Sequence, residues 1–250
     1  MITYFPRRPA SHVPDPKYMT AIEHLEELRR RLVVSILAVA LGSAAGWFLA
    51  PGTIHLLDAP LRAQLHAQGR LIVNTIYGGF TLQLKVAILI GFAYALPVTL
   101  SQLWLFLAPA FGPRAGRFGP LVIGSALGLF TAGAVTGFLV IPMSVRFFTS
   151  FQGTDVQLLP FASEYVGFVS LILVVFGASF ELPLVLVGLS AGGITSSRQL
   201  ASRRLVFFFA VFLFATVVTP GADWISPLIL GSILYLLFEV SILICRWLGK

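Results

Sequence analysis

Long stretches without a charged side chain restrict what this chain can fold into. No Asp, Glu, Lys or Arg occurs between residues 32 and 57, or between residues 118 and 145. About 20 consecutive apolar residues are enough for a helix to cross a bilayer. Only 11% of the residues are charged and 57% are hydrophobic, whereas soluble domains carry about 25% charged residues. This composition excludes a soluble enzyme, a disordered region and a secreted disulfide scaffold. It predicts an all-α integral membrane protein.

Six transmembrane helices are predicted from runs of this kind. They lie at residues 33–50, 76–107, 118–145, 165–189, 205–218 and 225–245. The second run contains Lys85 and is expected to kink at Pro97, because proline cannot donate the backbone hydrogen bond of a helix. The fourth run is interrupted by Glu181 and Pro183.

The fifth and sixth helices are predicted to be short. Residues 205–218 cover roughly 21 Å at about 1.5 Å per residue, against a hydrocarbon core of about 30 Å. One interpretation is that the helix stops short and thins the bilayer, with Thr219 and Pro220 in the headgroup region. The other is that flanking residues such as Arg204 extend the helix by snorkelling.

The first span is expected to be retained as a helix. Three glutamates precede it, whereas a signal peptide begins with a short basic segment. The proline-containing residues 1–19 are predicted to form a mobile cytoplasmic tail. Residues 20–250 are predicted to form a single six-helix domain.

Basic residues between the spans predict the orientation in the membrane. With the N-terminus inside, thirteen cations lie on the cytoplasmic side and three (Arg62, Arg70 and Arg146) on the other. The thirteen are Arg7, Arg8, Lys17, Arg29, Arg30, Arg31, Arg114, Arg117, Arg198, Arg203, Arg204, Arg246 and Lys250. The positive-inside rule therefore places both termini in the cytoplasm. It also explains the net charge of +7 without a nucleic-acid partner.

An amphipathic cytoplasmic helix is predicted immediately before the first span. Thr20 and Glu23 have the spacing of a capping box, and apolar residues follow at helical intervals. Glu23, Glu26 and Glu27 fall within an arc of about 100° on this helix. They either pair locally with arginines four residues on, or form a carboxylate cluster suited to a peptide with adjacent arginines.

No motif for bond-making chemistry occurs in the sequence. There is no nucleotide-binding glycine loop, no nucleophile motif and no cluster of metal ligands. Cys245 is the single cysteine, which excludes an internal disulfide. The sequence therefore predicts a protein without catalytic residues, metal or cofactor.

Five segments resemble the TatC family, the multispanning receptor of the twin-arginine protein translocase. They run in the family's order over most of the chain. They are His-Leu-Glu-Glu-Leu-Arg-Arg-Arg-Leu at residues 24–32; Gly91 with Pro97; Gln-Leu-Trp-Leu-Phe at residues 102–106 with Ala108 and Pro109; Phe-Gly-Ala-Ser-Phe-Glu-Leu-Pro at residues 176–183; and Thr219, Pro220 and Asp223 with Leu-Phe-Glu at residues 237–239.

The resemblance implies a receptor that binds twin-arginine signal peptides of folded proteins at its cytoplasmic face. It implies assembly with single-span TatA- and TatB-type subunits in the cell inner membrane, as an oligomer in contact with lipids, and export driven by the proton-motive force. Glu27 and Arg29 occupy the Glu-Leu-Arg positions of the family. Pro60, Pro97, Pro109 and Asp223 are expected to be structural or periplasmic motif residues.

The chain departs from the family in the first cytoplasmic loop. Aligning Trp104 and Pro109 places Ala115 where the family has a second glutamate, and residues 112–117 contain no acid. Either Glu23 or Glu26 supplies the missing charge, or the peptide is recognised differently.

Polar residues within the spans are the remaining candidates for a site. Charging Glu181 near the bilayer centre costs about 2.5–3.5 kcal/mol, so its side chain is expected to be protonated, paired or in a wet cavity. By resemblance, Glu181 belongs to a pocket that docks partner helices. Glu239, Lys85 and Tyr165 are grouped with it as partner-docking or intramembrane polar residues, and a structural role for Glu239 is an equal alternative. The alternative function is a proton-coupled small-solute transporter in which Glu181, Glu239 and Lys85 form a relay. An acidic segment outside the membrane favours the translocase receptor.

Overall fold

The computed structural model describes residues 21–65, 71–111, 115–151, 161–218 and 224–249, and these residues form an all-α bundle. Within those ranges there is no β-strand, and one isolated bridge joins Ile72 to Phe161. The α-helices are α1 (Ala21–Leu57), α2 (Ala59–Leu65), α3 (Gly78–Leu107), α4 (Gly119–Ser150), α5 (Ala162–Ser179), α6 (Leu182–Ala191), α7 (Ser197–Ser202), α8 (Arg204–Val218) and α9 (Ile225–Trp247). Two 3₁₀ helices, η2 (Ala108–Phe111) and η3 (Ala115–Phe118), join α3 to α4. The predicted all-α fold is confirmed.

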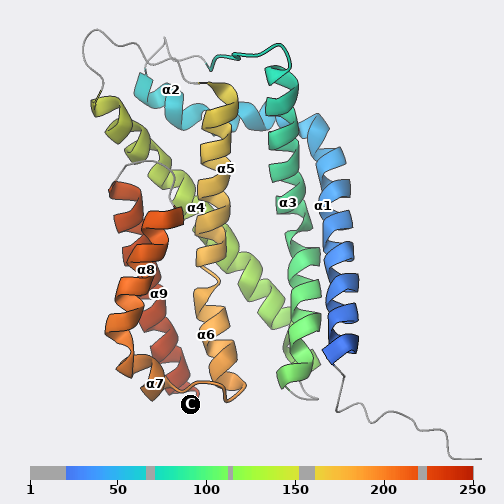
Figure 1. Cartoon of the computed structure of the whole chain (residues 1–250), viewed down its shortest axis with the longest axis vertical. Helices are drawn as coiled ribbons and strands as arrows, with labels where there is room; N and C mark the ends of the chain where they lie inside the picture. Colours follow the sequence, from blue (N-terminus) through green and yellow to red (C-terminus); the bar gives the residue numbers. More distant parts are fainter. Residues whose placement is uncertain (1–20, 66–70, 112–114, 152–160, 219–223, 250) are drawn as a thin grey trace, which may run out of the picture.

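Five segments of the described chain are long and apolar enough to cross a membrane. They include α1, α3, α4, the α5–α6 pair and α9. The fifth predicted span is α8, an apolar helix of 15 residues, which covers about 22 Å at 1.5 Å per residue. The end of α8 and the start of α9 lie well below the tops of α4 and α5 (Figure 1). The fifth helix is therefore short, as predicted. The prediction of a short sixth helix is wrong, because α9 runs for 23 residues and is long enough to cross a membrane.

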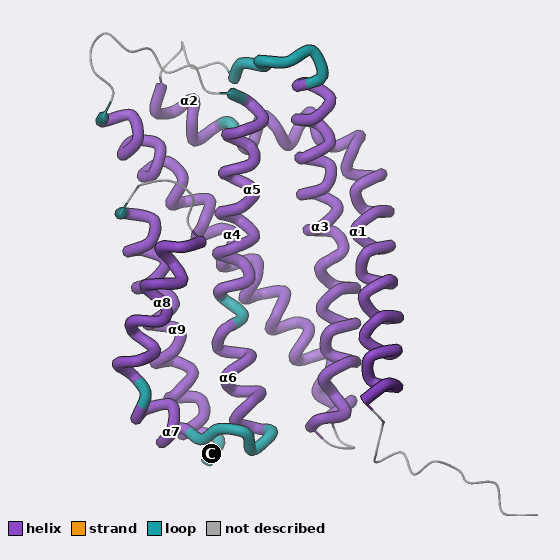
Figure 2. Tube along the Cα trace, viewed as in Figure 1, coloured by secondary structure: helices purple, strands orange, loops and turns teal. Residues whose placement is uncertain are grey.

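The ends of the bundle differ in which connections they carry. α1 begins, and α9 ends, at the end drawn lowest in Figure 1, where α7 also lies. We call this the lower end. The opposite, upper end carries α2 and the beginning of α3 (Figure 1). The described chain outside the helices consists of short connections, mostly at the two ends (Figure 2).

The predicted cytoplasmic helix and the first span form one continuous helix. α1 runs for 37 residues, about 55 Å at 1.5 Å per residue, which exceeds the thickness of the hydrocarbon core. Its first turns carry Glu23, Glu26 and Glu27, and its last turn ends beside α2. The capping residue Thr20 lies outside the described residues, as does the predicted tail.

Glycines bring two pairs of helices into close backbone contact. A Cβ on Gly42 of α1 would lie 2.8 Å from the Gly91 carbonyl oxygen of α3, and one on Gly133 of α4 would lie 2.4 Å from the Phe176 carbonyl oxygen of α5. Gly46 and Gly137, one turn further on, are similarly close to α3 and α5. Helices that approach so closely pack by van der Waals contact in a membrane, where no hydrophobic effect drives association. These contacts hold α1 on α3 and α4 on α5.

The fourth predicted span breaks at its centre. α5 ends at Ser179 and α6 begins at Leu182, with Phe180 and Glu181 in a turn between them. Pro183 has no amide hydrogen to donate to Ser179, four residues earlier, which weakens the helix and favours a break at this point. The break is visible between α5 and α6 in Figure 2. By contrast, α3 continues through Pro97 to Leu107.

Candidate functional site

The acidic end of α1 packs against the end of α3 at the lower end of the bundle. The imidazole of His24 stacks on the ring of Phe106, with centroids 4.3 Å apart and planes 15° apart. Two turns further along α1, Arg31 donates a hydrogen bond to Gln102 Oε1 of α3 at 3.4 Å. Glu27 lies between these two contacts along α1. The two helices therefore place Glu27 against α3 at the lower end.

Glu27 differs from the other two glutamates of the predicted cluster. Its side chain is only 14% exposed, whereas Glu23, Glu26 and Arg29 are exposed on the helix surface. Arg31 Nε donates to Glu27 Oε1 at 2.9 Å, and Arg31 Nη2 contacts the same oxygen. Among the described residues, Glu27 Oε2 is buried without a hydrogen-bond partner. Glu27 therefore has one carboxylate oxygen bonded to Arg31 and one without a partner among the described residues, next to the contact between α1 and α3.

Local pairing of the acids with arginines occurs at one of the two expected positions. Glu27 and Arg31 form an ion pair, while Glu26 and Arg30 form none within the described residues. The connection from α3 to α4 folds back on Trp104, whose ring stacks on Phe111 with centroids 5.8 Å apart. Ala115, aligned above with a family glutamate, is buried within η3.

Glu181 lies in the turn between α5 and α6. Its side chain is half-buried, and within the described chain its Oε1 atom is buried without a hydrogen-bond partner. The backbone at Glu181 is satisfied, because its amide donates to the Ala178 carbonyl at 3.1 Å. The polar group without a partner is therefore the side chain, at the middle of a membrane-spanning segment.

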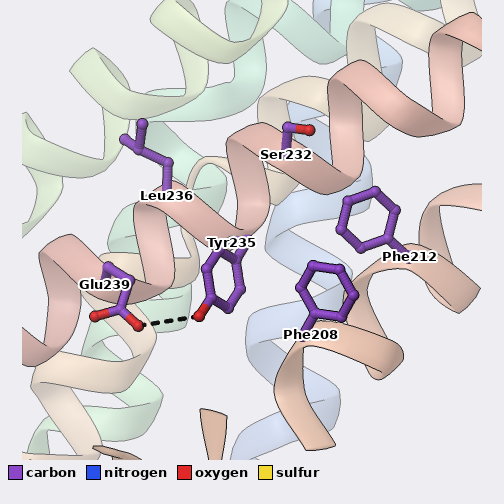
Figure 3. Close-up of a pocket in the computed structure, with 6 residues that line it drawn as sticks. All are labelled: Phe208, Phe212, Ser232, Tyr235, Leu236 and Glu239. Atoms are coloured by element: carbon purple, nitrogen blue, oxygen red, sulfur yellow. Dashed lines mark hydrogen bonds between the residues drawn. The ribbon is translucent and has the colours of Figure 1, made fainter. Parts of the chain in front are cut away.

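Glu239 of α9 binds Arg204 of α8 through two hydrogen bonds. Arg204 Nε donates to Oε1 at 2.6 Å and Nη2 donates to Oε2 at 2.8 Å. Tyr235 also donates its hydroxyl hydrogen to Glu239 Oε1 at 3.3 Å, drawn as a dashed line in Figure 3. A groove of about 380 Å³ borders this carboxylate, and its lining includes Phe208, Phe212 and Tyr235 (Figure 3).

Lys85 and Tyr165 make hydrogen bonds within the bundle. Lys85 Nζ donates to the hydroxyl of Ser163 at 2.7 Å and to its carbonyl at 3.1 Å. The buried Tyr165 hydroxyl donates to the Leu57 carbonyl at the end of α1, at 3.0 Å. Both bonds join helices of the bundle, so each side chain has a structural partner within the chain.

The three residues of the alternative proton relay have separate partners. Lys85 bonds to Ser163, Glu239 to Arg204, and Glu181 Oε1 to none of the described residues. No hydrogen bond or ion pair connects the three within the described ranges.

The predicted motif residues take up different structural positions. Pro60 is buried in α2, Pro97 lies inside α3 and Pro109 lies in η2. Asp223 lies outside the described residues. Near Pro60, the buried Asp58 forms an ion pair with Arg62, and this acid was not among the residues singled out from the sequence.

The comparisons with known proteins agree with this architecture. The family model described as "Sec-independent protein translocase protein (TatC)" matches residues 23–232. The apolar helices are those of a multi-pass α-helical membrane protein, and the matched family is one of protein translocase components. The chain belongs to the TatC family and is a component of a protein translocase.

Relatives named "Sec-independent protein translocase protein TatC" align over nearly the whole chain. The protein of Carboxydothermus hydrogenoformans is 33% identical over 94% of this chain and 96% of its own length. That of Escherichia coli strain K12 is 32% identical over 92% of this chain and 89% of its own. A solved structure, "Crystal Structure of Twin Arginine Translocase Receptor- TatC", superposes with a TM-score of 0.78 at 30% identity, covering 91% of this chain and 100% of that chain.

Proposed function

We propose that this chain is the receptor subunit of a twin-arginine translocase and that Glu27 binds the paired arginines of a signal peptide. The observation that carries the proposal is the carboxylate of Glu27, which is packed on α3 and keeps one oxygen without a partner among the described residues. A planar guanidinium binds a carboxylate through two parallel hydrogen bonds. The solved relative, named a twin-arginine translocase receptor, supports the same role.

The lower end of the bundle is the cytoplasmic face in this proposal. The positive-inside rule favours that side for both termini, and α1 begins and α9 ends there (Figure 1). Cargo would then approach Glu27 from the cytoplasm, with the surrounding bundle in the cell inner membrane. Glu23, Glu26 and Arg29 are exposed on the same helix and supply a charged surface around Glu27.

Glu181 and the groove beside Glu239 are the proposed docking sites for single-span TatA- and TatB-type subunits. A carboxyl group without a partner in a spanning segment is stabilised by a hydrogen-bond donor from another helix. The aromatic groove between α8 and α9 is open at the surface of the bundle and bordered by Glu239. Oligomeric assembly and use of the proton-motive force belong to the same proposal.

Site-specific photo-crosslinking tests the receptor role. A photoreactive residue replaces Arg117, which is exposed at the end of η3, or Arg198, which is exposed on α7 at the same end of the bundle. We expect a twin-arginine signal peptide to be labelled from position 117 and not from position 198. A peptide with two lysines should not be labelled from either. Equal labelling of the arginine and lysine peptides would overturn the proposal.

A further inference from the structure

The carboxylate of Glu27 is already held by a guanidinium of the same chain. Arg31 directs both Nε, at 2.9 Å, and Nη2 to the single oxygen Oε1 of Glu27. The two side chains are 13% and 14% exposed, so the pair is largely shielded from water. Any cation that binds Oε1 of Glu27 therefore has to compete with Arg31.

The Glu27–Arg31 ion pair involves only one of the two carboxylate oxygens of Glu27. Glu27 Oε2 is buried and has no hydrogen-bond partner among the described residues. A buried acceptor without a donor is unfavourable, because it has lost its hydration without gaining a replacement. A ligand that donates to Oε2 as well as Oε1 would relieve this deficit.

Arg31 also has a second acceptor within reach. Its Nη1 donates to Gln102 Oε1 of α3 at 3.4 Å, near the long limit for a hydrogen bond. The amide oxygen of Gln102 therefore lies where it can still accept a hydrogen bond from the guanidinium if Arg31 leaves Glu27. The neighbouring arginines, Arg29 and Arg30, are exposed and make no ion pair with Glu27 in the described part of the chain.

We propose that Arg31 is the residue that makes this site select arginine over lysine, an inference that rests on the proposed receptor function. Arg31 occupies Glu27 in the peptide-free receptor and moves toward Gln102 when a peptide arginine binds. A lysine ammonium is a point charge. When it displaces Arg31 from Glu27 it only exchanges one cation for another, so the peptide gains little binding free energy. An arginine forms two parallel bonds, using Oε2 as well as Oε1, and displaces Arg31.

Peptide binding to the full chain in lipid nanodiscs tests this role. The dissociation constants of a twin-arginine signal peptide and its twin-lysine version are measured for the wild type, Arg31→Gln and Arg30→Gln. With Arg31 replaced, Glu27 is a free charge that any cation can neutralise. We therefore expect the arginine-to-lysine affinity ratio of Arg31→Gln to fall by about tenfold, mainly through tighter binding of the lysine peptide.

The control variant separates this role from a general loss of charge. Arg30→Gln removes one positive charge from the same helix turn but leaves the Glu27–Arg31 pair intact, so its affinity ratio should match that of the wild type. An Arg31→Gln ratio equal to the wild-type ratio would overturn the inference while leaving the receptor function standing. A wild type that does not bind the twin-arginine peptide would overturn both.

A second variant covers the case in which Arg31→Gln does not fold. Gln102→Leu removes the acceptor that receives the displaced guanidinium but keeps the ion pair. We expect it to weaken binding of the arginine peptide about threefold to tenfold and to leave the lysine peptide unchanged. Equal effects on both peptides, or none, would contradict the exchange of Arg31 between Glu27 and Gln102.

Discussion

Gly133 of α4 lies directly against the backbone of Phe176 in α5, so close that a Cβ on Gly133 would sit 2.4 Å from the Phe176 carbonyl oxygen. The same added atom would lie 2.9 Å from the Cα of Gly177. Both obstacles are backbone atoms, which cannot rotate away. The closeness of α4 and α5 therefore depends on the absence of a side chain at residue 133.

Replacing Gly133 by alanine should force α4 and α5 apart. Overpacking of this kind costs about 1–3 kcal/mol, measured as a lower midpoint of thermal unfolding in detergent. The matched control is Gly128→Ala on the same helix, where an added Cβ would meet no atom within 4 Å. Equal midpoints for the two variants would contradict the close packing of α4 on α5.

The hydrogen bond from Tyr165 to the Leu57 carbonyl should stabilise the upper end of the bundle. Tyr165→Phe removes the donor and leaves a buried carbonyl with one partner fewer, at a cost of about 1–2 kcal/mol. Tyr94→Phe is the control, since Tyr94 is 64% exposed on α3. Thermal unfolding in detergent compares the two variants. A loss of stability from Tyr94→Phe as large as that from Tyr165→Phe would contradict the assignment.

The Arg204–Glu239 pair should hold α8 against α9. Glu239→Gln keeps the size of the side chain but removes its charge and one of the two oxygens that accept hydrogen bonds from Arg204. We expect the unfolding midpoint to fall by a few degrees. The charge reversal Arg204→Glu with Glu239→Arg should recover part of this loss, whereas either reversal alone should not. No recovery in the double variant would show that the pair itself contributes nothing.

Glu181→Ala should weaken docking of a single-span partner and leave signal-peptide binding largely intact. The carboxyl group has a buried oxygen without a partner among the described residues, so a partner helix gains a hydrogen bond there. Disulfide or photo-crosslinking yield to the partner subunit is the measurement, with a decrease of about tenfold expected. Glu164→Gln, at an exposed acid on the same span, is the control. Unchanged yield for Glu181→Ala would remove it from the docking site.

The helical architecture follows from the sequence because the physical signal is strong. Uncharged runs such as residues 118–145 have one stable solution in a bilayer, a helix that satisfies its own backbone. The interruption by Glu181 and Pro183 was also visible, since proline cannot continue the ladder of hydrogen bonds. The structure adds that a turn at Phe180 and Glu181 divides the fourth span into α5 and α6.

Contacts between distant residues were beyond sequence reasoning. Arg204 and Glu239 are 35 residues apart, and Arg31 and Gln102 are 71 apart. Spacing along one helix cannot pair them, because their meeting depends on how separate helices pack. The glycine contacts, by contrast, correspond to a recognisable spacing in the sequence. Gly42 and Gly46, like Gly133 and Gly137, have the small-xxx-small spacing of packed membrane helices.

The acidic segment shows how far a candidate site can be predicted. Helical periodicity placed Glu23, Glu26 and Glu27 on one face, and the structure shows that Glu27 alone among the three is largely buried. That distinction depends on where α3 ends, which the sequence of α1 does not contain. The binding roles of these residues remain predictions.

Export of a twin-arginine reporter protein tests the central claim most directly. Cells that lack their own receptor receive this chain, with its matching single-span partner subunits, as the wild type, as Glu27→Gln or as Glu26→Gln. Both variants lose one acid from the same turn of α1. Of the two acids, only Glu27 is largely buried, and its Oε2 atom has no hydrogen-bond partner among the described residues. We expect export with the wild type and with Glu26→Gln, and a loss of about tenfold or more with Glu27→Gln. Undiminished export with Glu27→Gln would contradict the account.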